Sequence, residues 1–271
     1  MTLSLDVIVL ELVGAKASAA CAAALRQVGS PALSVHIEPK QSGSIPHRRL
    51  HALQRSDADL VLLVEDTVRL DSRWLSTCQK VAAMPAFAGG SGPVRLSSSL
   101  DAKACAWARH EYAAALGTSP GSVESLPGHV LLLHRARCLE ALEESGLQHD
   151  GIREDTLFPL LRAHGATLHI LKGLGAELIA ADPSGSSLRG QFLHGRGWAA
   201  RESLRMRWSA SRRLGRLVAW PAVAALRLGR AAPPFTHTSE FGHTLALSVA
   251  WALGESVGAV LGQSANEDHW T

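Results

Sequence analysis

The stretch that decides the fold is Ala58-Asp-Leu-Val-Leu-Leu-Val-Glu-Asp-Thr-Val-Arg-Leu-Asp-Ser-Arg-Trp-Leu75. Its apolar run, residues 60–64, is unbroken and stops at two carboxylates, Glu65 and Asp66. An apolar run this short predicts a strand buried on both faces, as in a parallel α/β sheet. In open α/β sheets, ligands bind outside the carboxyl ends of the strands. The sequence therefore directs attention to Glu65 and Asp66.

Two interpretations of this acidic turn are open from the residues alone. Acids at the end of a strand can hold a divalent cation, and the cation can hold a nucleotide diphosphate. Alternatively, Glu65 and Asp66 only open a solvated turn and cap the helix that begins near Trp74. Spacing alone does not separate the two.

The first 64 residues alternate between strand and helix patterns. Strands are predicted at 6–11, 33–38 and 60–64, and helices at 15–28 and 48–55. Strand–helix–strand repeats of this length are typical of a parallel sheet with right-handed crossovers. The predicted fold class is therefore α/β, with a mainly parallel central sheet flanked by helices.

The next 120 residues or so continue with further helix and strand patterns. The predicted elements are a helix at 74–84, a glycine-rich bend at 89–93, a helix at 102–116, a loop and strand at 126–135, a helix that ends at Gly165, and strands within 168–181. A linker-like break follows at 183–187. We therefore predict one domain over residues 1–183 and an appendage over 184–271, made of a basic linker and an apolar helical segment.

Composition excludes several classes of protein. Hydrophobic residues make up 46% of the 271 residues and charged residues 19%, which argues against disorder. The four cysteines show no paired spacing, so neither a zinc site nor a disulfide framework is indicated. The N-terminus shows no secretory signal, which favours a cytoplasmic protein.

Charge is distributed unevenly. Residues 189–230 hold ten arginines and one acid, whereas residues 231–271 hold four acids and no Lys or Arg. A basic segment beside an apolar one predicts binding to an anionic surface, and the inner face of a cell membrane is the natural candidate. Nucleic acid is not the expected partner, because the segment lacks interleaved aromatic residues and known reading motifs.

The apolar stretches 217–228 and 245–261 are predicted to be helical. Glu255 interrupts the second, and a charge at the centre of a bilayer is costly. Two arrangements stay open: a re-entrant or interfacial helix pair, and a soluble helical hairpin.

The acidic turn resembles a segment of glycosyltransferase family 2. An apolar strand, two or three acids, about seven residues and Trp-Leu form the metal-binding segment of these inverting enzymes of the GT-A fold, and here Trp74-Leu75 follows Glu65-Asp66. The family usually carries Asp-x-Asp, so its second Asp falls on Thr67. The resemblance implies that Glu65 and Asp66 bind Mg²⁺ or Mn²⁺ together with a nucleotide-sugar donor.

The same resemblance implies further donor-binding residues. Glu11 and Glu38 end the first two predicted strands, where the family contacts the nucleoside. Arg49 matches the arginine of the family's Ala-Arg-Asn-x-Gly helix start, and it would face the diphosphate. On the residues alone, an exposed arginine on a solvated helix is the favoured interpretation of Arg49.

On the acceptor side, the resemblance covers two segments. Pro127-Gly128-His129 matches the family's Pro-Gly loop, where a backbone that passes close to a sugar needs glycine. Glu154-Asp155 begins the helix that is catalytic in the family. We predict Asp155 as the general base and Glu154 as its neighbour or an acceptor ligand, with the roles exchangeable. Two acids at a helix N-terminus are also favoured by the helix dipole alone.

Further matches lie in the C-terminal part. His194-Gly-Arg196 resembles a segment found after the catalytic helix in many bacterial members, so that His194 would bind the metal and Arg196 the diphosphate. Gly254-Glu255 matches the family's terminal motif. A lone histidine is, however, more often structural. The Gln-x-x-Arg-Trp motif of processive synthases is absent, which disfavours polymer synthesis.

The ordered set of motifs predicts an inverting glycosyltransferase. It would move a sugar from a nucleotide-diphosphate sugar to a hydroxyl of a glycan or lipid-linked acceptor, in cell-surface glycan or glycolipid synthesis at the inner face of the membrane. Two alternatives stay open: a GT-A-like nucleotide-binding protein that has lost turnover, for which Thr67, Leu50 and Glu38 argue, and a scaffold at the membrane surface that uses only the basic segment.

Overall fold

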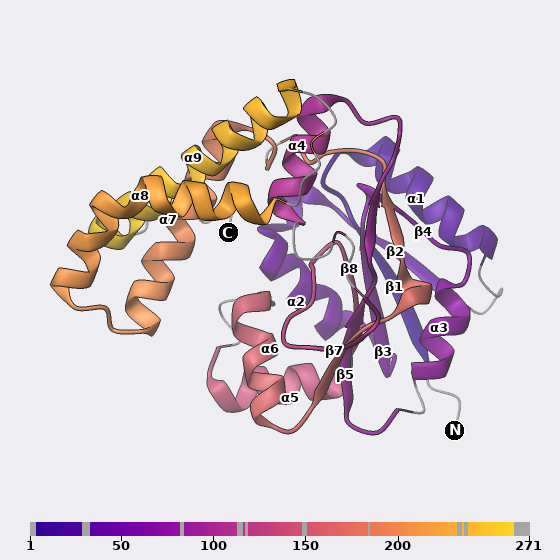
Figure 1. The fold of residues 1–271 in the computed structure, drawn as a ribbon. Coiled ribbons are helices and arrows are strands. Elements are labelled where there is room, and N and C mark those ends of the chain that lie inside the picture. The colour runs from indigo at the N-terminus through magenta and orange to yellow at the C-terminus, as the bar shows by residue number, and fades with distance from the viewer. Residues whose placement is uncertain are drawn as a thin grey trace. The chain divides into compact units, whose positions relative to one another are not determined.

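The computed structural model describes residues 4–28, 33–81, 84–112, 116, 119–147, 151–183, 185–231, 235 and 238–262 (Figure 1). The chain divides into two compact units. The sheet unit comprises Met1–Ser97 and Ala114–Ala180, and the helical unit comprises Ser98–Ala113 and Ala181–Thr271. Each unit is described on its own.

The sheet unit is built on a seven-stranded mixed sheet. In spatial order its strands are β2 (Ser34–Glu38), β1 (Leu5–Leu10), β3 (Leu60–Glu65), β8 (Val130–His134), β5 (Phe87–Ser91), β9 (Thr167–Ile170) and β7 (Gly121–Val123). β1 pairs in parallel with β2 and β3, but β8 runs antiparallel to both β3 and β5, and β7 is antiparallel to β9.

The predicted α/β class is therefore confirmed, whereas the sheet is mixed rather than mainly parallel. The apolar run of β8 is buried like that of β3, and an apolar run does not encode the direction of a strand. Every residue of β3 is buried, as the opening stretch predicted.

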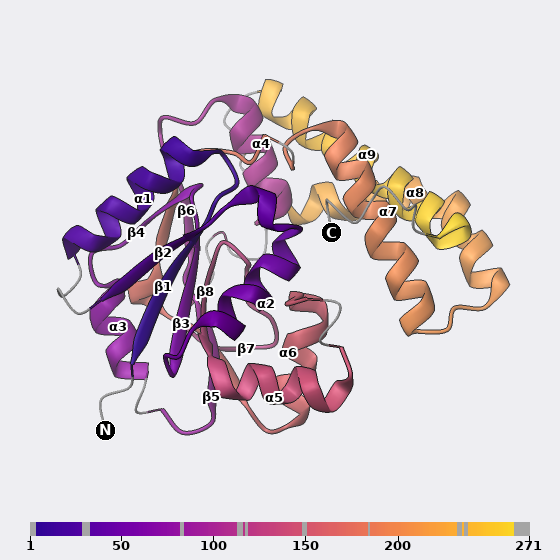
Figure 2. The same ribbon diagram turned by 180° about the vertical axis from the view of Figure 1, so that it is seen from behind.

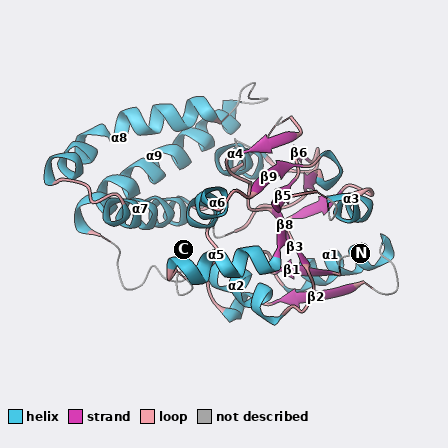
Figure 3. Ribbon diagram, turned by 90° about the horizontal axis from the view of Figure 1, so that it is seen from below, coloured by secondary structure: helices cyan, strands magenta, loops and turns pink. Residues whose placement is uncertain are grey.

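Helices cover both faces of this sheet (Figures 2 and 3). α1 (Ala15–Val28) and α3 (Trp74–Val81) lie on one face, and α2 (Ile45–Arg55), α5 (Arg135–Ser145) and α6 (Glu154–Ala163) on the other (Figure 3). On this second face a single apolar core joins Leu53 of α2, Leu142 of α5 and Phe158 of α6 to Leu63 and Leu131 of the sheet. The shared core fixes the beginnings of α2 and α6 relative to the strands.

A second, three-stranded sheet follows the acidic turn. It consists of β4 (Val68–Leu70), β10 (Ala176–Leu178) and β6 (Val94–Leu96), with the one-turn helices Lys40–Ser42 and Lys172–Leu174 elsewhere in the same unit. The N–H groups of Ile179 and Ala180 donate to the carbonyl oxygen of Thr67, at 2.9 and 3.2 Å. The small sheet thereby holds the turn that ends β3.

Residues 89–91 of the glycine-rich stretch predicted as a bend are instead part of strand β5, whereas Gly92-Pro93 connects β5 to strand β6. Side chains from neighbouring segments occupy the space beside its glycines. A Cβ on Gly89 would lie 3.1 Å from Leu126, and one on Gly90 would lie 2.6 Å from Leu171. These glycines therefore make room for apolar packing.

The helical unit contains α4 (Ala102–Glu111), α7 (Leu188–Arg205), α8 (Ala210–Arg230) and α9 (Thr238–Leu261). α9 packs against the other three. Glycines bring α7 and α9 unusually close: a Cβ on Gly195 would collide with the carbonyl oxygen of Trp251, and Cβ atoms on Gly254 and Gly258 would collide with carbonyl oxygens of α7. The His-Gly-Arg and Gly-Glu motifs therefore form a helix crossing.

α9 is long and apolar enough to cross a membrane, by length and composition alone. However, 56% of its most apolar window is buried inside the protein, and its two acids, Glu240 and Glu255, are 1% and 4% exposed. Both acids are ion-paired, Glu240 with Arg109 and Glu255 with Arg216. These features fit the central helix of a helical unit.

The helix crossing generates the first prediction. Gly254→Ala should destabilise the helical unit by about 1–3 kcal/mol, because the new methyl group displaces the backbone of α7. Urea unfolding followed by tryptophan fluorescence measures this, since six of the seven tryptophans, all but Trp74, fall within the residue ranges of this unit.

Gly215→Ala on α8 is the matched control, because nothing lies within 4 Å of the Cβ that it would add. In a helix this change alone is worth about 0.5–1 kcal/mol in favour of alanine. Equal unfolding midpoints for the two variants would contradict a close crossing.

Candidate functional site

The carboxyl ends of β1, β2 and β3 gather buried ionisable side chains. Exposed fractions are between 1% and 4% for Glu38, Arg48, Arg49, Glu65 and Asp66. Burying charges is costly unless they are paired and hydrogen-bonded. A cluster of this kind at the ligand-binding edge of an α/β sheet marks the candidate site.

Arg49 lies at the centre of the cluster. It is 4% exposed, so the interpretation of Arg49 as an exposed arginine on a solvated helix is wrong. Its guanidinium donates to Glu154 Oε1 at 2.6 Å and to the carbonyl oxygen of Gly128 at 3.1 Å. It also lies 3.5 Å from Glu65 Oε1. One side chain from α2 thus joins the end of β3, the loop before β8 and the start of α6.

Glu154 is held by this arginine. Burial alone would raise the pKa of the Glu154 carboxyl, but the charge of Arg49, a backbone N–H and the Arg49 hydrogen bond together outweigh burial and lower the pKa. A carboxylate with a lowered pKa is a weak base. Glu154 is therefore suited to positioning rather than to proton transfer.

Gly128 is required by the same contact. A Cβ at this position would collide with Glu154 Oε1 and lie 2.5 Å from Arg49 Nη2. The start of α6 is also docked on α2 through the backbone, since Ile152 N–H donates to the carbonyl oxygen of Pro46 at 2.8 Å. Gly151 adopts a φ of +72°, which favours glycine, and a Cβ there would press on Pro46.

Asp66 holds the loop between β1 and α1. Its carboxylate accepts hydrogen bonds from the N–H groups of Leu12 at 2.9 Å, Val13 at 3.1 and 3.2 Å, and Gly14 at 3.3 Å. Three successive backbone donors on one carboxylate form a firm anchor. Asp66 therefore shapes the wall of the site rather than opening a solvated turn.

The fit of a divalent cation to the acidic turn can be judged from these contacts. Both oxygens of Asp66 face N–H groups, Glu65 is engaged with Arg49, and the Thr67 hydroxyl donates to Glu65 Oε2 at 3.4 Å. No group of three or more His, Cys, Asp or Glu side chains that suits a metal occurs among the described residues. The side chains as arranged do not form a cation site.

A second part of the cluster surrounds Arg48, which the sequence motifs did not single out. Burial lowers the pKa of Arg48, whereas the charges of Glu38, Glu11 and Asp66 act to raise it. Arg48 also donates to the carbonyl oxygen of Glu38, and His51 Nδ1 lies 3.1 Å from Glu38 Oε1. Three basic residues in succession, His47 to Arg49, at a helix start beside the sheet edge were the available signal.

His129, predicted on the acceptor side, is completely buried. Burial lowers its pKa to about 3; a backbone hydrogen bond with Gly92 opposes this, and the charge of Arg49 adds to it. The imidazole is therefore neutral at physiological pH. The backbone carbonyl oxygen of His129 accepts from Glu65 N–H at 3.0 Å. In the same loop, the carbonyl oxygen of Pro127 accepts from the Ser91 hydroxyl at 3.2 Å.

Asp155, the predicted base, follows Glu154 on α6. Its side chain is 45% exposed, and its Oδ1 lies 3.7 Å from Arg153 Nε. Unlike Glu154, it makes no close hydrogen bond to the buried cluster among the described contacts. Asp155 is thus the more accessible of the two acids.

His194 and Arg196 belong to the helical unit. The His194 ring lies 4.6 Å from the ring of Trp251, and Arg196 Nε donates to the carbonyl oxygen of Gly262 at 3.1 Å. These contacts are those of helix packing within the helical unit. Their assignment to metal and diphosphate stays a prediction.

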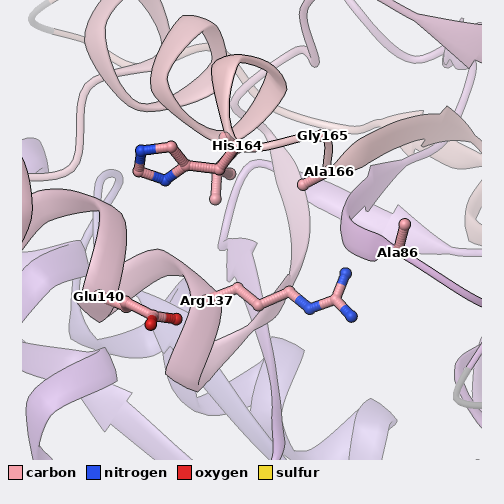
Figure 4. A pocket seen from close by; sticks show the side chains of 7 residues that line it. Ala86, Arg137, Glu140, His164, Gly165 and Ala166 are labelled. Carbon is pink, nitrogen blue, oxygen red and sulfur yellow. The ribbon is translucent and has the colours of Figure 1, made fainter.

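A hollow of about 290 Å³ lies elsewhere in the sheet unit (Figure 4). Its lining includes Arg137 and Glu140 of α5, His164 after α6, and Ala86 and Ala166. Ala86 and Ala166 directly precede the parallel strands β5 and β9, so the hollow lies at their amino ends. It is therefore at the opposite edge from the charged cluster.

Comparison with solved structures places the fold. The chain is similar to the mannosyltransferase PcManGT from Pyrobaculum calidifontis, solved in complex with GDP-Man and Mn2+, with a TM-score of 0.56 and 12% sequence identity. The similarity covers 94% of this chain and 87% of that one. No family model and no curated protein matches the sequence. The fold is therefore like that of a glycosyltransferase, while membership of family 2 stays a prediction.

The contact at Gly128 generates the second prediction. Gly128→Ala should destabilise the sheet unit by about 1–3 kcal/mol, because the methyl group drives Arg49 and Glu154 apart. In a Glu154→Ala background the same change should cost less, since part of the obstruction is gone. A double-mutant cycle by urea unfolding measures the coupling. Strict additivity would contradict a direct contact.

The third prediction concerns pH. The folded pKa of His129, about 3, lies below its ordinary value of 6.5, so as pH falls below 6.5 the unfolded chain takes up a proton that the folded chain does not. Stability should fall by about 1.4 kcal/mol per pH unit from this residue between about pH 6 and pH 4. His129→Gln should flatten the slope measured by circular dichroism.

His36→Gln is the control for the loss of an imidazole at an exposed position. An unchanged slope in His129→Gln would show that the His129 site admits a proton in the folded state.

Proposed function

We propose that the sheet unit binds a nucleotide-diphosphate sugar at the carboxyl ends of β1–β3 and transfers the sugar to an acceptor hydroxyl with inversion. One observation carries this proposal: the buried cluster centred on Arg49 fixes the start of α6, with its two acids, beside the ligand-binding edge. The similarity of fold to an enzyme solved with GDP-Man supports it.

In this mechanism Asp155 takes the proton from the acceptor hydroxyl. The acceptor oxygen attacks the anomeric carbon, the bond from that carbon to the diphosphate oxygen breaks, and the nucleoside diphosphate leaves with the electron pair. Asp155 suits the role because it is accessible, whereas Glu154 is held by Arg49. Glu154 and Arg49 act as positioning residues.

The donor would contact Glu11, Glu38 and the loop 12–14 held by Asp66, with the acceptor beside Pro127, Gly128 and His129. The fold relative contains Mn2+, and a Mg²⁺ or Mn²⁺ requirement stays an expectation for this chain. The present arrangement of Glu65 and Asp66 does not fit a cation. We therefore assign no step to a cation.

The finer parts of the proposal concern family and setting. The ordered motifs favour an inverting enzyme of glycosyltransferase family 2, in cell-surface glycan or glycolipid synthesis, with a glycan or lipid-linked acceptor. They also favour a cytoplasmic protein peripheral to the inner face of the membrane. A nucleotide-binding protein without turnover is the second candidate, because the acids of the metal turn are all engaged within the protein.

The fourth prediction separates these two functions. Asp155→Asn should lower sugar transfer by ~10²–10⁴, the usual effect of losing a general base, with nucleotide affinity retained. Donor consumption with GDP-mannose and a panel of UDP-sugars, beside calorimetric titration of the nucleoside diphosphates, measures both. Each assay is run with Mn²⁺ and with EDTA.

Glu154→Gln is the matched control, since it changes the neighbouring acid on the same helix turn and weakens the Arg49 contact. Glu154→Gln should lower the melting temperature clearly. Asp155→Asn should reduce the free energy of unfolding by no more than ~1 kcal/mol, the scale of a helix-dipole contribution. Full transfer by Asp155→Asn would refute the assignment of the base. Nucleotide binding without transfer in the wild-type protein would favour the second candidate.

A further inference from the structure

Helix α8 of the helical unit turns apolar residues to the solvent and arginines toward the interior. A surface helix normally turns its charged residues to water and its apolar residues to the core. On α8 the residues that face inward include Arg213, Arg216 and Arg227, which are half-buried. In the fully described segment 214–229 no exposed residue is charged; the exposed ones are Leu214, Gly215, Leu217, Val218, Pro221, Ala222, Ala225, Leu226 and Gly229.

The inward arginines are held by partners within the helical unit. Arg216 Nη1 lies 2.6 Å from Glu255 Oε1, and the guanidinium of Arg227 lies 3.7 Å from the centre of the Trp251 ring. Burial lowers the pKa of Arg227 to about 10, opposed by the charges of Glu111 and Glu255. The outward apolar face is therefore a consequence of fixed internal contacts.

The apolar exposure on this face is large. Val218 is 80% exposed, Leu226 63%, Leu214 59% and Leu217 41%. The nearby end of α7 exposes Leu204 and Met206 in addition. Contiguous exposed apolar side chains mark an interaction surface rather than a solvated one.

Charge identifies the occupant of this surface. Arg212 precedes the apolar face and Arg230 ends it. Arg205 ends α7, where it pairs with Glu202, and Arg207 lies in the turn before α8; all four arginines are exposed. The whole segment 189–230 holds ten arginines against one acid. Apolar side chains bordered by arginines match the boundary between acyl chains and anionic headgroups.

We propose that the outward face of α8 lies in the headgroup region of an anionic lipid bilayer, with Leu214, Leu217, Val218 and Leu226 inserted. The helix then lies parallel to the membrane surface, and the arginines at its two ends contact lipid phosphates. The attachment at α8 deepens the membrane setting given under the proposed function and does not depend on sugar transfer.

The fifth prediction tests the apolar face with the full-length protein. The protein should co-sediment with vesicles of phosphatidylcholine and phosphatidylglycerol in equal parts, and far less with phosphatidylcholine alone. Leu217→Asn with Val218→Asn should weaken binding about tenfold or more, since two apolar side chains no longer enter the lipid. Leu188→Asn is the matched control, because Leu188 is 55% exposed on α7 outside this face. It should leave binding unchanged.

The arginines form the second arm. Arg230→Gln should weaken binding about fivefold, the scale of one basic residue near an anionic surface, and high salt should release the protein. Trp220, half-buried on α8, should shift its fluorescence on binding, and Trp220→Phe should remove that shift. Circular dichroism confirms that each variant is folded.

Failure of the protein to bind anionic vesicles at low salt would overturn the proposal. Equal binding to phosphatidylcholine alone, or unchanged binding of the Leu217→Asn, Val218→Asn variant, would overturn it too. A concentration-dependent dimer in light scattering that this variant breaks would assign the face to a second copy of the chain. That result also counts against a lipid occupant.

Discussion

The sheet unit depends on one buried guanidinium. Arg49 is the shared partner of Glu65, Glu154 and the Gly128 carbonyl, and no apolar residue can satisfy three acceptors from three segments. Removing one partner of a buried ion pair typically costs about 3–5 kcal/mol, because the other charge is left uncompensated. The cost of the cluster is therefore an argument for function: apolar packing would hold these segments together as well, without the desolvation penalty.

The acids of the turn after β3 divide the work of shaping the site. Asp66 fixes the loop 12–14 through successive N–H groups, and Glu65 engages Arg49. Both carboxylates are used to set backbone and side-chain positions before any ligand arrives. Such preorganisation lowers the cost of ordering the site on binding. It also means that a ligand or cation that needs these oxygens must displace contacts already made.

Local patterns anticipated much of the sheet unit but not its connections. The apolar run at 60–64 is enough to predict a strand buried on both faces, and the alternation of elements predicts the α/β class. The direction of β8 could not be predicted from the sequence, because a strand buried on both faces has the same apolar pattern whether it runs parallel or antiparallel. The role of Arg49 as a bridge was equally hidden: its partners lie 79 and 105 residues away. Sequence spacing encodes local geometry, whereas such contacts depend on the packing of α2 against α6.

The helical unit shows why composition alone misjudges a basic segment. Ten arginines in 189–230 suggest a charged surface, yet Arg213, Arg216 and Arg227 turn inward and the outer face of α8 is apolar. Glu255 had suggested a costly charge within an apolar stretch, but it is the partner that holds Arg216 inside. The ion pair between Arg216 and Glu255 fixes the rotation of α8 against α9, and that rotation decides which residues meet the solvent. An acid within one apolar helix thus determines the apolar face of its neighbour.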